Sequence, residues 1–88
     1  MAKLVAFTPE SAAALTEYVK IQLNAISNAL PELEVEQANE LDSRMQYAWY
    51  PDRFPAFIIF AEPGVRLAAL HAKIGSDELI SWINSNLR

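Results

Sequence analysis

A run of apolar residues at positions 56–60, with the sequence AFIIF, most limits the folds open to this chain. A strand with one face in water alternates apolar and polar side chains, and this run has no polar position. It therefore predicts a central β-strand that is covered on both faces. Such a strand needs a packing layer on each side of its sheet, and the rest of the chain must supply both layers.

The residues after this run predict a hairpin. Residues 62–65 (EPGV) fit a type II turn, because proline suits the second position of that turn and glycine suits the third. Residues 66–73 (RLAALHAK) then form the return strand, antiparallel to the central one.

The N-terminal third predicts a strand followed by a long helix. Residues 3–7 are mostly apolar and indicate a buried strand. Thr8 is a good N-cap and Pro9 suits the first helical position, so we expect a helix to begin at Pro9 and to end before Pro31. This helix is expected to be about twenty residues long, and its apolar residues recur at three- and four-residue spacing, so that they share one side. These residues are Leu15, Tyr18, Val19, Leu23, Ile26 and Leu30.

The middle of the chain predicts a second strand and a shorter helix. Residues 33–37 (LEVEQ) alternate, as in a strand with one wet face. Asn39 or Asp42 can cap the helix, which must end near Tyr50 because Pro51 disfavours helical geometry in the residue before it. One side of this helix carries Leu41, Met45 and Trp49.

A last helix follows the hairpin. Residues 75–77 (GSD) supply its cap. Its buried stripe consists of Leu79, Ile83 and Leu87, with Ile80 alongside.

The expected element order is β-α-β-α-β-β-α within one domain, residues 1–88. The first β-α-β unit should form a right-handed crossover with parallel strands, and the final hairpin joins the same sheet antiparallel. These connections predict an α/β fold with a mixed four-stranded sheet and helices on both faces. A domain of 88 residues is marginally stable alone, so we expect a protein partner or a homo-oligomer.

The charge pattern argues against a nucleic-acid partner. The formal net charge is −4, and the 7 basic residues are scattered singly, whereas nucleic-acid binding needs clustered lysine and arginine. The longest apolar run, about six residues, is far short of the roughly twenty that span a bilayer, so we expect no membrane contact. The N-terminus lacks the apolar stretch of a signal peptide, and the expected location is cytoplasmic.

The element order, with a proline directly before the third strand, resembles that of thioredoxin-like folds. The likeness extends to residues from about Arg53 onward, FPAFIIF-AEPGVRLAALHAKIGSDELISWINSNL, which are similar to the C-terminal half of a thioredoxin. The resemblance implies a cis peptide bond before Pro55, which X–Pro bonds can adopt at a cost of only about 0.5–1 kcal/mol.

The chain departs from this family at its reactive centre. Thioredoxins carry paired cysteines where the first strand meets the first helix, because the helix N-terminus lowers the thiol pKa. This chain has no cysteine, and Ser11 and Ala14 stand at about the equivalent, vestigial positions. Thioredoxin activity is therefore absent. With one histidine and no cysteine, we expect no zinc site and no cofactor.

A second resemblance concerns the KaiB family of circadian-clock proteins, which is thioredoxin-like and also lacks the cysteine pair. That family carries a Thr-Pro-Asn-Ser stretch at the same junction, and residues 8–11 (TPES) followed by Ala14-Leu15 are similar to it. A Thr-Pro start is also a common way to cap a helix.

The groove beside Pro55 is the expected functional edge. The candidate partner-binding residues lie on two segments; they are Thr8, Pro9, Tyr50, Arg53, Phe54 and Pro55. Tyrosine, tryptophan and arginine are favoured anchors at protein interfaces. The alternatives are an ordinary helix cap at Thr8 and Pro9, and core packing for the aromatic residues.

Three further features have simpler explanations. His71, the only histidine, is expected in the fourth strand as a surface or partly buried residue. An acidic stretch around the second strand indicates a solvated face or, alternatively, a cation site; it consists of Glu32, Glu34, Glu36, Glu40 and Asp42. Trp82 lies off the stripe of the last helix and marks a possible second contact surface.

Three functions fit these features. The first is a redox-inactive interaction or structural module, such as a component of a virion or another multiprotein assembly, and not an enzyme. The second is a binder of a glutathione-like small molecule or a cysteine-independent enzyme, in which Ser11 or Tyr50 would orient the ligand thiol. The third is a signalling protein similar to KaiB.

Overall fold

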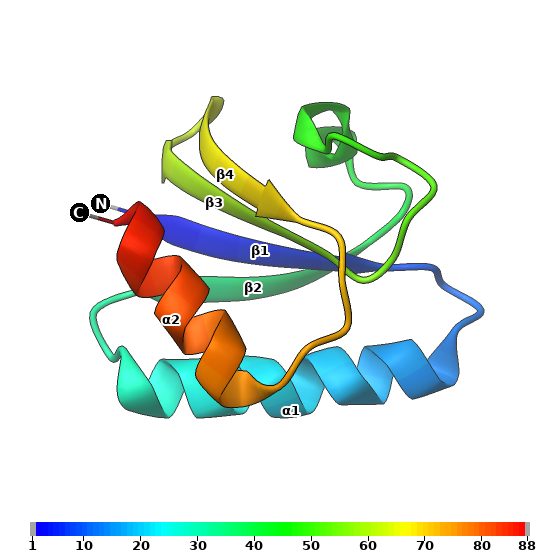
Figure 1. The fold of residues 1–88 in the computed structure, drawn as a ribbon. Coiled ribbons are helices and arrows are strands. Elements are labelled where there is room, and N and C mark those ends of the chain that lie inside the picture. The colour runs from blue at the N-terminus through cyan, green and yellow to red at the C-terminus, as the bar shows by residue number, and fades with distance from the viewer. Residues whose placement is uncertain (1, 88) are drawn as a thin grey trace.

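Strand β3 (Ala56–Glu62) contains the apolar run and lies inside the sheet. In a computed structural model, which describes residues 2–87, β3 lies between β1 (Lys3–Thr8) and β4 (Val65–Leu70). Strand β2 (Glu34–Asn39) forms the other edge, so that the order is β2-β1-β3-β4 (Figure 1). Every residue of the run 56–60 is buried, which confirms the prediction of a strand covered on both faces.

The sheet is mixed, as predicted. β1 pairs parallel with β2 and antiparallel with β3, and β3 pairs antiparallel with β4. In the ladder between β1 and β3, Phe7 lies opposite Ala56. One step further along this antiparallel register, Thr8 reaches the level of Pro55. The sheet thus places the end of the first strand beside the loop that precedes β3.

Both α-helices pack on one face of the sheet. Helices α1 (Ala13–Ala29) and α2 (Ser76–Asn86) lie together below the strands in Figure 1. The core between sheet and helices consists of Leu4, Ala6, Phe57 and Ile59 from the strands, Leu33 before β2, and Val19, Leu23, Ile26, Leu79 and Ile83 from the helices. Full burial of one such large aliphatic or aromatic side chain contributes about 1.5–3 kcal/mol, so this layer dominates the stability of the fold.

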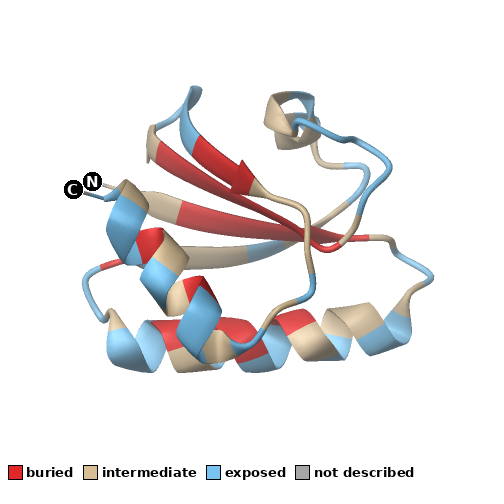
Figure 2. Ribbon diagram, in the orientation of Figure 1, coloured by how far each residue is buried: buried red, intermediate tan, exposed pale blue. Residues whose placement is uncertain are grey.

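The opposite face is covered by a short 3-10 helix and a loop. Its buried residues are Val5, Phe7, Ala56, Ile58, Phe60 and Ala69. Helix η1 (Ser43–Tyr47) and the loop after it pack against them through Met45, Tyr47, Ala48 and Phe54. Figure 2 shows the buried strands between these two unequal layers. A helix was expected on each face, and the second is this one-and-a-half-turn 3-10 helix rather than an α-helix.

The expected apolar stripe of the second helix is wrong for that reason. The helix spans only Ser43–Tyr47, so Leu41 precedes its N-cap and Trp49 follows its C-cap. Met45 packs inward, whereas Leu41 and Trp49, at four-residue spacing on either side, are 74% and 52% exposed. Of the two predicted caps, Asp42 is the N-cap, since its side chain accepts a hydrogen bond from the Arg44 backbone N–H.

Helix α1 begins later than predicted. Thr8 remains in β1, paired with Asn39, and its buried hydroxyl lies 3.3 Å from that of Thr16. The chain then turns, with the Ala12 N–H donating to the Pro9 carbonyl, and Ala12 is the N-cap. Strand pairing therefore takes precedence over the capping preference of Thr8. The C-terminal end, Ala29, lies before Pro31 as predicted.

In the C-terminal part, α2 buries Leu79 and Ile83 as predicted, whereas Leu87, its C-cap, is exposed, because the helix ends at Asn86. Strand β4 ends at Leu70, so His71 lies just beyond it rather than within it. The loop that follows is held to α1 because the Tyr18 hydroxyl accepts from the Ile74 N–H and donates to its carbonyl, and burial raises the pKa of Tyr18. Trp82 is half-buried against the core, and a second contact surface there stays a prediction. Within residues 2–87, no helix has the length and apolar character that crossing a membrane requires.

The hairpin between β3 and β4 depends on Gly64. Its φ is +81°, and a Cβ atom there would lie 3.3 Å from the Tyr47 hydroxyl oxygen. We expect Gly64→Ala to lower the free energy of unfolding by about 1–2 kcal/mol, measured by urea unfolding, because L-residues are strained in this region. Gly75→Ala is the control, since no atom lies within 4 Å of the added carbon and only a cap preference of about 0.5 kcal/mol is lost. Equal losses in the two variants would contradict the explanation.

Candidate functional site

The loop between η1 and β3, residues 48–55, carries most of the predicted site residues. Tyr50 and Arg53 are exposed, Phe54 is half-buried against the sheet, and Pro55 is buried. The Phe54–Pro55 peptide bond is cis, in agreement with the resemblance. The loop therefore has an inner side that packs on the sheet and an outer side that presents Tyr50 and Arg53.

Thr8 and Pro9 border a different hollow. It has a volume of about 480 Å³ and is open to solvent. Its other lining residues are Glu10, Thr16, Gln37, Ala38 and Asn39, which belong to the β1–α1 turn, α1 and β2. Register brings Thr8 to the level of Pro55, but Tyr50 and Arg53 do not line this hollow. The expected single groove is thus divided into two surfaces.

The vestigial positions lie at the start of α1. Ser11 is exposed in the turn before the helix, and Ala14 is exposed in its first turn. Ala12, the N-cap, provides no side-chain cap. At the position where thioredoxins carry their cysteines, this chain therefore exposes the hydroxyl of Ser11 and the methyl group of Ala14.

His71 holds the outer side of the loop in place. Its Nε2 accepts from the Tyr50 backbone N–H at 3.4 Å, and its Nδ1 lies 3.1 Å from the Arg53 carbonyl oxygen. Both contacts are satisfied by the neutral tautomer that carries its proton on Nδ1. The imidazole also meets the Tyr50 ring edge to face, with centroids 5.2 Å apart. This role was not expected from the sequence, where His71 is simply a lone histidine.

Each exposed aromatic ring in this region has an arginine beside it. The Arg53 guanidinium lies 4.4 Å from the centroid of the Tyr50 ring, and the Arg66 guanidinium lies 5.3 Å from that of Trp49. Arg66 extends from β4 and donates through Nη1 to the Tyr47 carbonyl at 2.6 Å. We call the surface formed by Trp49, Tyr50, Arg53, Arg66 and His71 the basic-aromatic surface. Sequence analysis missed Arg66 and His71, because only the pairing of β4 with β3 brings them to this loop.

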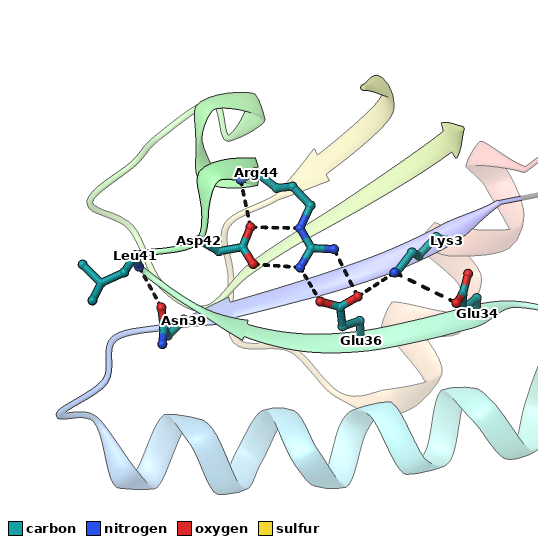
Figure 3. A network of polar contacts seen from close by, with 7 residues as sticks. All are labelled: Lys3, Glu34, Glu36, Asn39, Leu41, Asp42 and Arg44. Carbon is teal, nitrogen blue, oxygen red and sulfur yellow. Dashed lines mark hydrogen bonds and ion pairs between the residues drawn. The ribbon is translucent and has the colours of Figure 1, made fainter. Parts of the chain in front are cut away.

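Arg44 fixes η1 to the sheet. Its guanidinium makes two bidentate pairs, one with Asp42 at 2.8 and 2.9 Å and one with Glu36 of β2 (Figure 3). Lys3 of β1 reaches the same Glu36 carboxylate at 2.5 Å and Glu34 at 4.0 Å. Bidentate arginine–carboxylate pairs are stronger and more directional than single contacts. The network therefore sets where the chain leaves β2 and where the loop begins.

The hydrogen bonds and charges of this network shift the pKa values of its carboxyl groups and of Arg44. Hydrogen bonds from Arg44, and secondly from Lys3, lower the pKa of Glu36 from 4.5 to about 2. Hydrogen bonds from Arg44 lower the pKa of Asp42 from 3.8 to about 2, and the same carboxylates, Asp42 first, raise the pKa of Arg44.

Three of the five carboxylates of the acidic stretch therefore form ion pairs with two basic side chains. Glu34, Glu36 and Asp42 surround Lys3 and Arg44. Across residues 2–87, no three histidine or carboxylate side chains gather as they would around a metal ion. The Arg44 guanidinium lies between the Glu36 and Asp42 carboxylates, where a bound cation would lie, and this argues against the alternative of a cation site.

Comparison with known proteins shows the fold. No family model and no curated sequence matches the chain. Among solved structures, a malarial protein shares 14% identity with a TM-score of 0.74, covering 100% of this chain and 99% of its own. Fasciola hepatica thioredoxin shares 14% identity with a TM-score of 0.73, covering 97% of this chain and 80% of its own. Thioredoxin-2 of the malaria parasite shares 14% identity with a TM-score of 0.74, covering 97% of this chain and 82% of its own.

These likenesses show that the chain has a thioredoxin-like fold. Since it contains no cysteine, thioredoxin-type redox catalysis is excluded. The resemblance to KaiB gains no support from them and stays a prediction.

The lowered pKa of Glu36 predicts a specific acid sensitivity. A depressed carboxyl pKa stabilises the fold fully above its ordinary value of 4.5, and that contribution is lost as the pH falls toward 2. Because the side chain is 37% exposed, we expect a loss of only about 1 kcal/mol. Glu36→Gln should therefore be less stable at pH 7 and show a smaller fall between pH 5 and 2.5 in urea unfolding.

Glu34→Gln provides the matched control on the same strand. Glu34 lies 4.0 Å from Lys3 and is 63% exposed, so its removal should leave the pH dependence of the wild type. A Glu36→Gln variant with the wild-type pH dependence would contradict the role of the network.

The contacts of His71 predict a local effect on the loop. His71→Ala removes the acceptor of the Tyr50 N–H, which we expect to speed hydrogen exchange of that amide about fivefold or more, the equivalent of one hydrogen bond. Amides of β1 and β3 should exchange as in the wild type. Lys73→Ala, two residues further on, is the control. An unchanged Tyr50 rate in His71→Ala would show that the imidazole does not hold the loop.

Proposed function

We propose that this chain is a redox-inactive thioredoxin-fold module that binds another protein through the basic-aromatic surface. The observation that carries the proposal is the exposure of Trp49 and Tyr50, at 52% and 47%, on a loop held from both sides. Large aromatic side chains exposed side by side on a small domain indicate a contact surface. Tryptophan, tyrosine and arginine are also the residues that contribute most to protein interfaces.

The fixed backbone of the loop supports the same proposal. The network of Arg44 holds its start, the contacts of His71 hold Tyr50 and Arg53, and Pro55 anchors its end in the sheet. A surface that is ordered before binding loses less conformational entropy when a partner docks. The side chains are therefore presented in a binding-competent arrangement.

A place within a larger assembly is consistent with this role. Thioredoxin-2 of the malaria parasite, one of the structural neighbours, is described as a component of a protein secretion machinery. For the present chain, we propose a comparable structural or adaptor function without thiol chemistry.

A glutathione-like ligand is less well supported. Ser11 does not line the hollow at Thr8 and Pro9, and Tyr50 lies on the other surface. Glu10 borders the hollow and would repel an anionic peptide. The geometry thus favours protein binding over small-molecule binding.

The proposal predicts a protein complex that depends on the two exposed rings. We expect tagged wild-type protein to capture a defined partner from native lysate, and Trp49→Ala/Tyr50→Ala to reduce its yield at least about tenfold, as loss of interface anchors does. Quantitative mass spectrometry measures the yield, and circular dichroism checks the fold. Phe54 is a poorer choice for substitution because it packs against the sheet.

Ile21→Ala is the matched control, since Ile21 is an exposed apolar residue on α1. It should leave the yield unchanged. Repeated capture without any partner, or equal yields from the double variant and the wild type, would refute the proposed function.

A further inference from the structure

The arginines of the basic-aromatic surface differ from Arg44 in their unused charge. Arg44 has carboxylates on Nε, Nη1 and Nη2. Within residues 2–87, the ion pairs involve only Lys3 and Arg44 as cations, so Arg53 and Arg66 have no carboxylate partner. The charge of Arg44 is therefore neutralised within the domain, whereas the charges of Arg53 and Arg66 can pair with carboxylates of another molecule.

The hydrogen-bonding groups of these two arginines are also largely free. Arg66 donates one hydrogen bond, to the Tyr47 carbonyl, and the Arg53 guanidinium donates none to the described residues. A guanidinium has five N–H donors in a planar fork that matches a carboxylate. The neighbouring rings of Tyr50 and Trp49 hold these forks at the surface and reduce their contact with water.

We propose that the basic-aromatic surface binds an acidic segment of a partner protein, with carboxylates of that segment paired to Arg53 and Arg66. This inference rests on the proposed function and adds the chemistry of the partner to it. Charge complementarity carries it: two unpaired cations are exposed beside two exposed rings on a molecule whose formal net charge is −4. Apolar residues of the segment would cover Trp49 and Tyr50 while its carboxylates meet the arginines.

A protein segment fits this surface better than a nucleic acid. Duplex DNA carries one negative charge per about 1.7 Å of its axis, and binding it needs many cations in a continuous patch. This surface offers two arginines, and Asp52, exposed in the same loop, would face a phosphate chain. The carboxylates of a peptide can occur only at positions that face the arginines, so that none lies close to Asp52. The evenly spaced phosphates of a nucleic acid do not allow this, and one of them would be repelled by Asp52.

The test selects peptides and then measures their binding. A display library of random linear peptides is selected on the wild-type protein, and we expect enrichment of aspartate and glutamate next to apolar residues. The best peptide is then synthesised with a fluorescent label. Its affinity, measured by fluorescence polarisation, should fall about tenfold in Arg53→Gln and in Arg66→Gln, and should fall as NaCl is raised from 50 to 500 mM.

Lys20→Gln is the matched control, because it removes one positive charge at an exposed position of α1. It should change the affinity less than twofold. Selected peptides without an acidic excess, or affinities unchanged in both arginine variants, would overturn the inference. Displacement of the peptide by an equal concentration of oligodeoxythymidine would also overturn it, in favour of nucleic acid.

Failure of this inference can be distinguished from failure of the proposed function. A partner whose capture requires Trp49 and Tyr50 but not Arg53 or Arg66 would leave the interaction surface in place and refute only its acidic specificity. Capture that is independent of all four residues would refute both.

Discussion

The burial of β3 on both faces is the constraint from which the remaining structure follows. Each side of residues 56–60 must be covered, yet both α-helices lie on the same side of the sheet. The other side is left to a five-residue 3-10 helix and the loop after it. That segment must place Met45, Tyr47 and Phe54 on the sheet while its remaining residues face solvent. The exposed rings of Trp49 and Tyr50 are therefore a consequence of a thin layer, because a segment this short cannot turn all of its aromatic side chains inward.

A thin layer also needs polar contacts to fix its position. A 3-10 helix of this length has few internal hydrogen bonds and poor geometry, so it contributes little stability of its own. Arg44 joins it to β2 through Glu36, Arg66 joins its last residue to β4, and His71 joins the following loop to the end of β4. These contacts come from β2 and from β4 with the residue that follows it. They explain how a chain stretch without regular secondary structure can present a fixed surface.

The sequence specified the sheet better than the site. Apolar runs identify β1 and β3, alternation identifies β2, and the turn at Gly64 identifies β4, because strand patterns and turns are local signals. Thr8 and Pro9 are good capping residues, so the predicted start of α1 is too early, and only the pairing of Thr8 with Asn39 of β2 shows that Thr8 belongs to a strand. Leu41, Met45 and Trp49 have α-helical spacing, but whether a short segment adopts α or 3-10 geometry depends on its tertiary contacts. Tyr50 and Arg53 were proposed by residue type. The hairpin brings His71 to these two residues and Arg66 to Trp49, which sequence spacing does not reveal.

The absence of cysteine limits the chemistry that this fold can carry out. A thioredoxin-like fold with cysteines needs an accessible junction at the start of α1, whereas this chain has exposed Ser11 and Ala14 there. The basic-aromatic surface has more side-chain contacts than this junction, because its aromatic rings, guanidinium groups and imidazole contact one another. Exposed stacked rings and unpaired cations contribute little to stability, because surface charges and half-exposed aromatic groups lose only part of their contact with water. The thin layer accounts for the exposure of the two rings, and under the proposed function the same exposure is what makes them available to a partner.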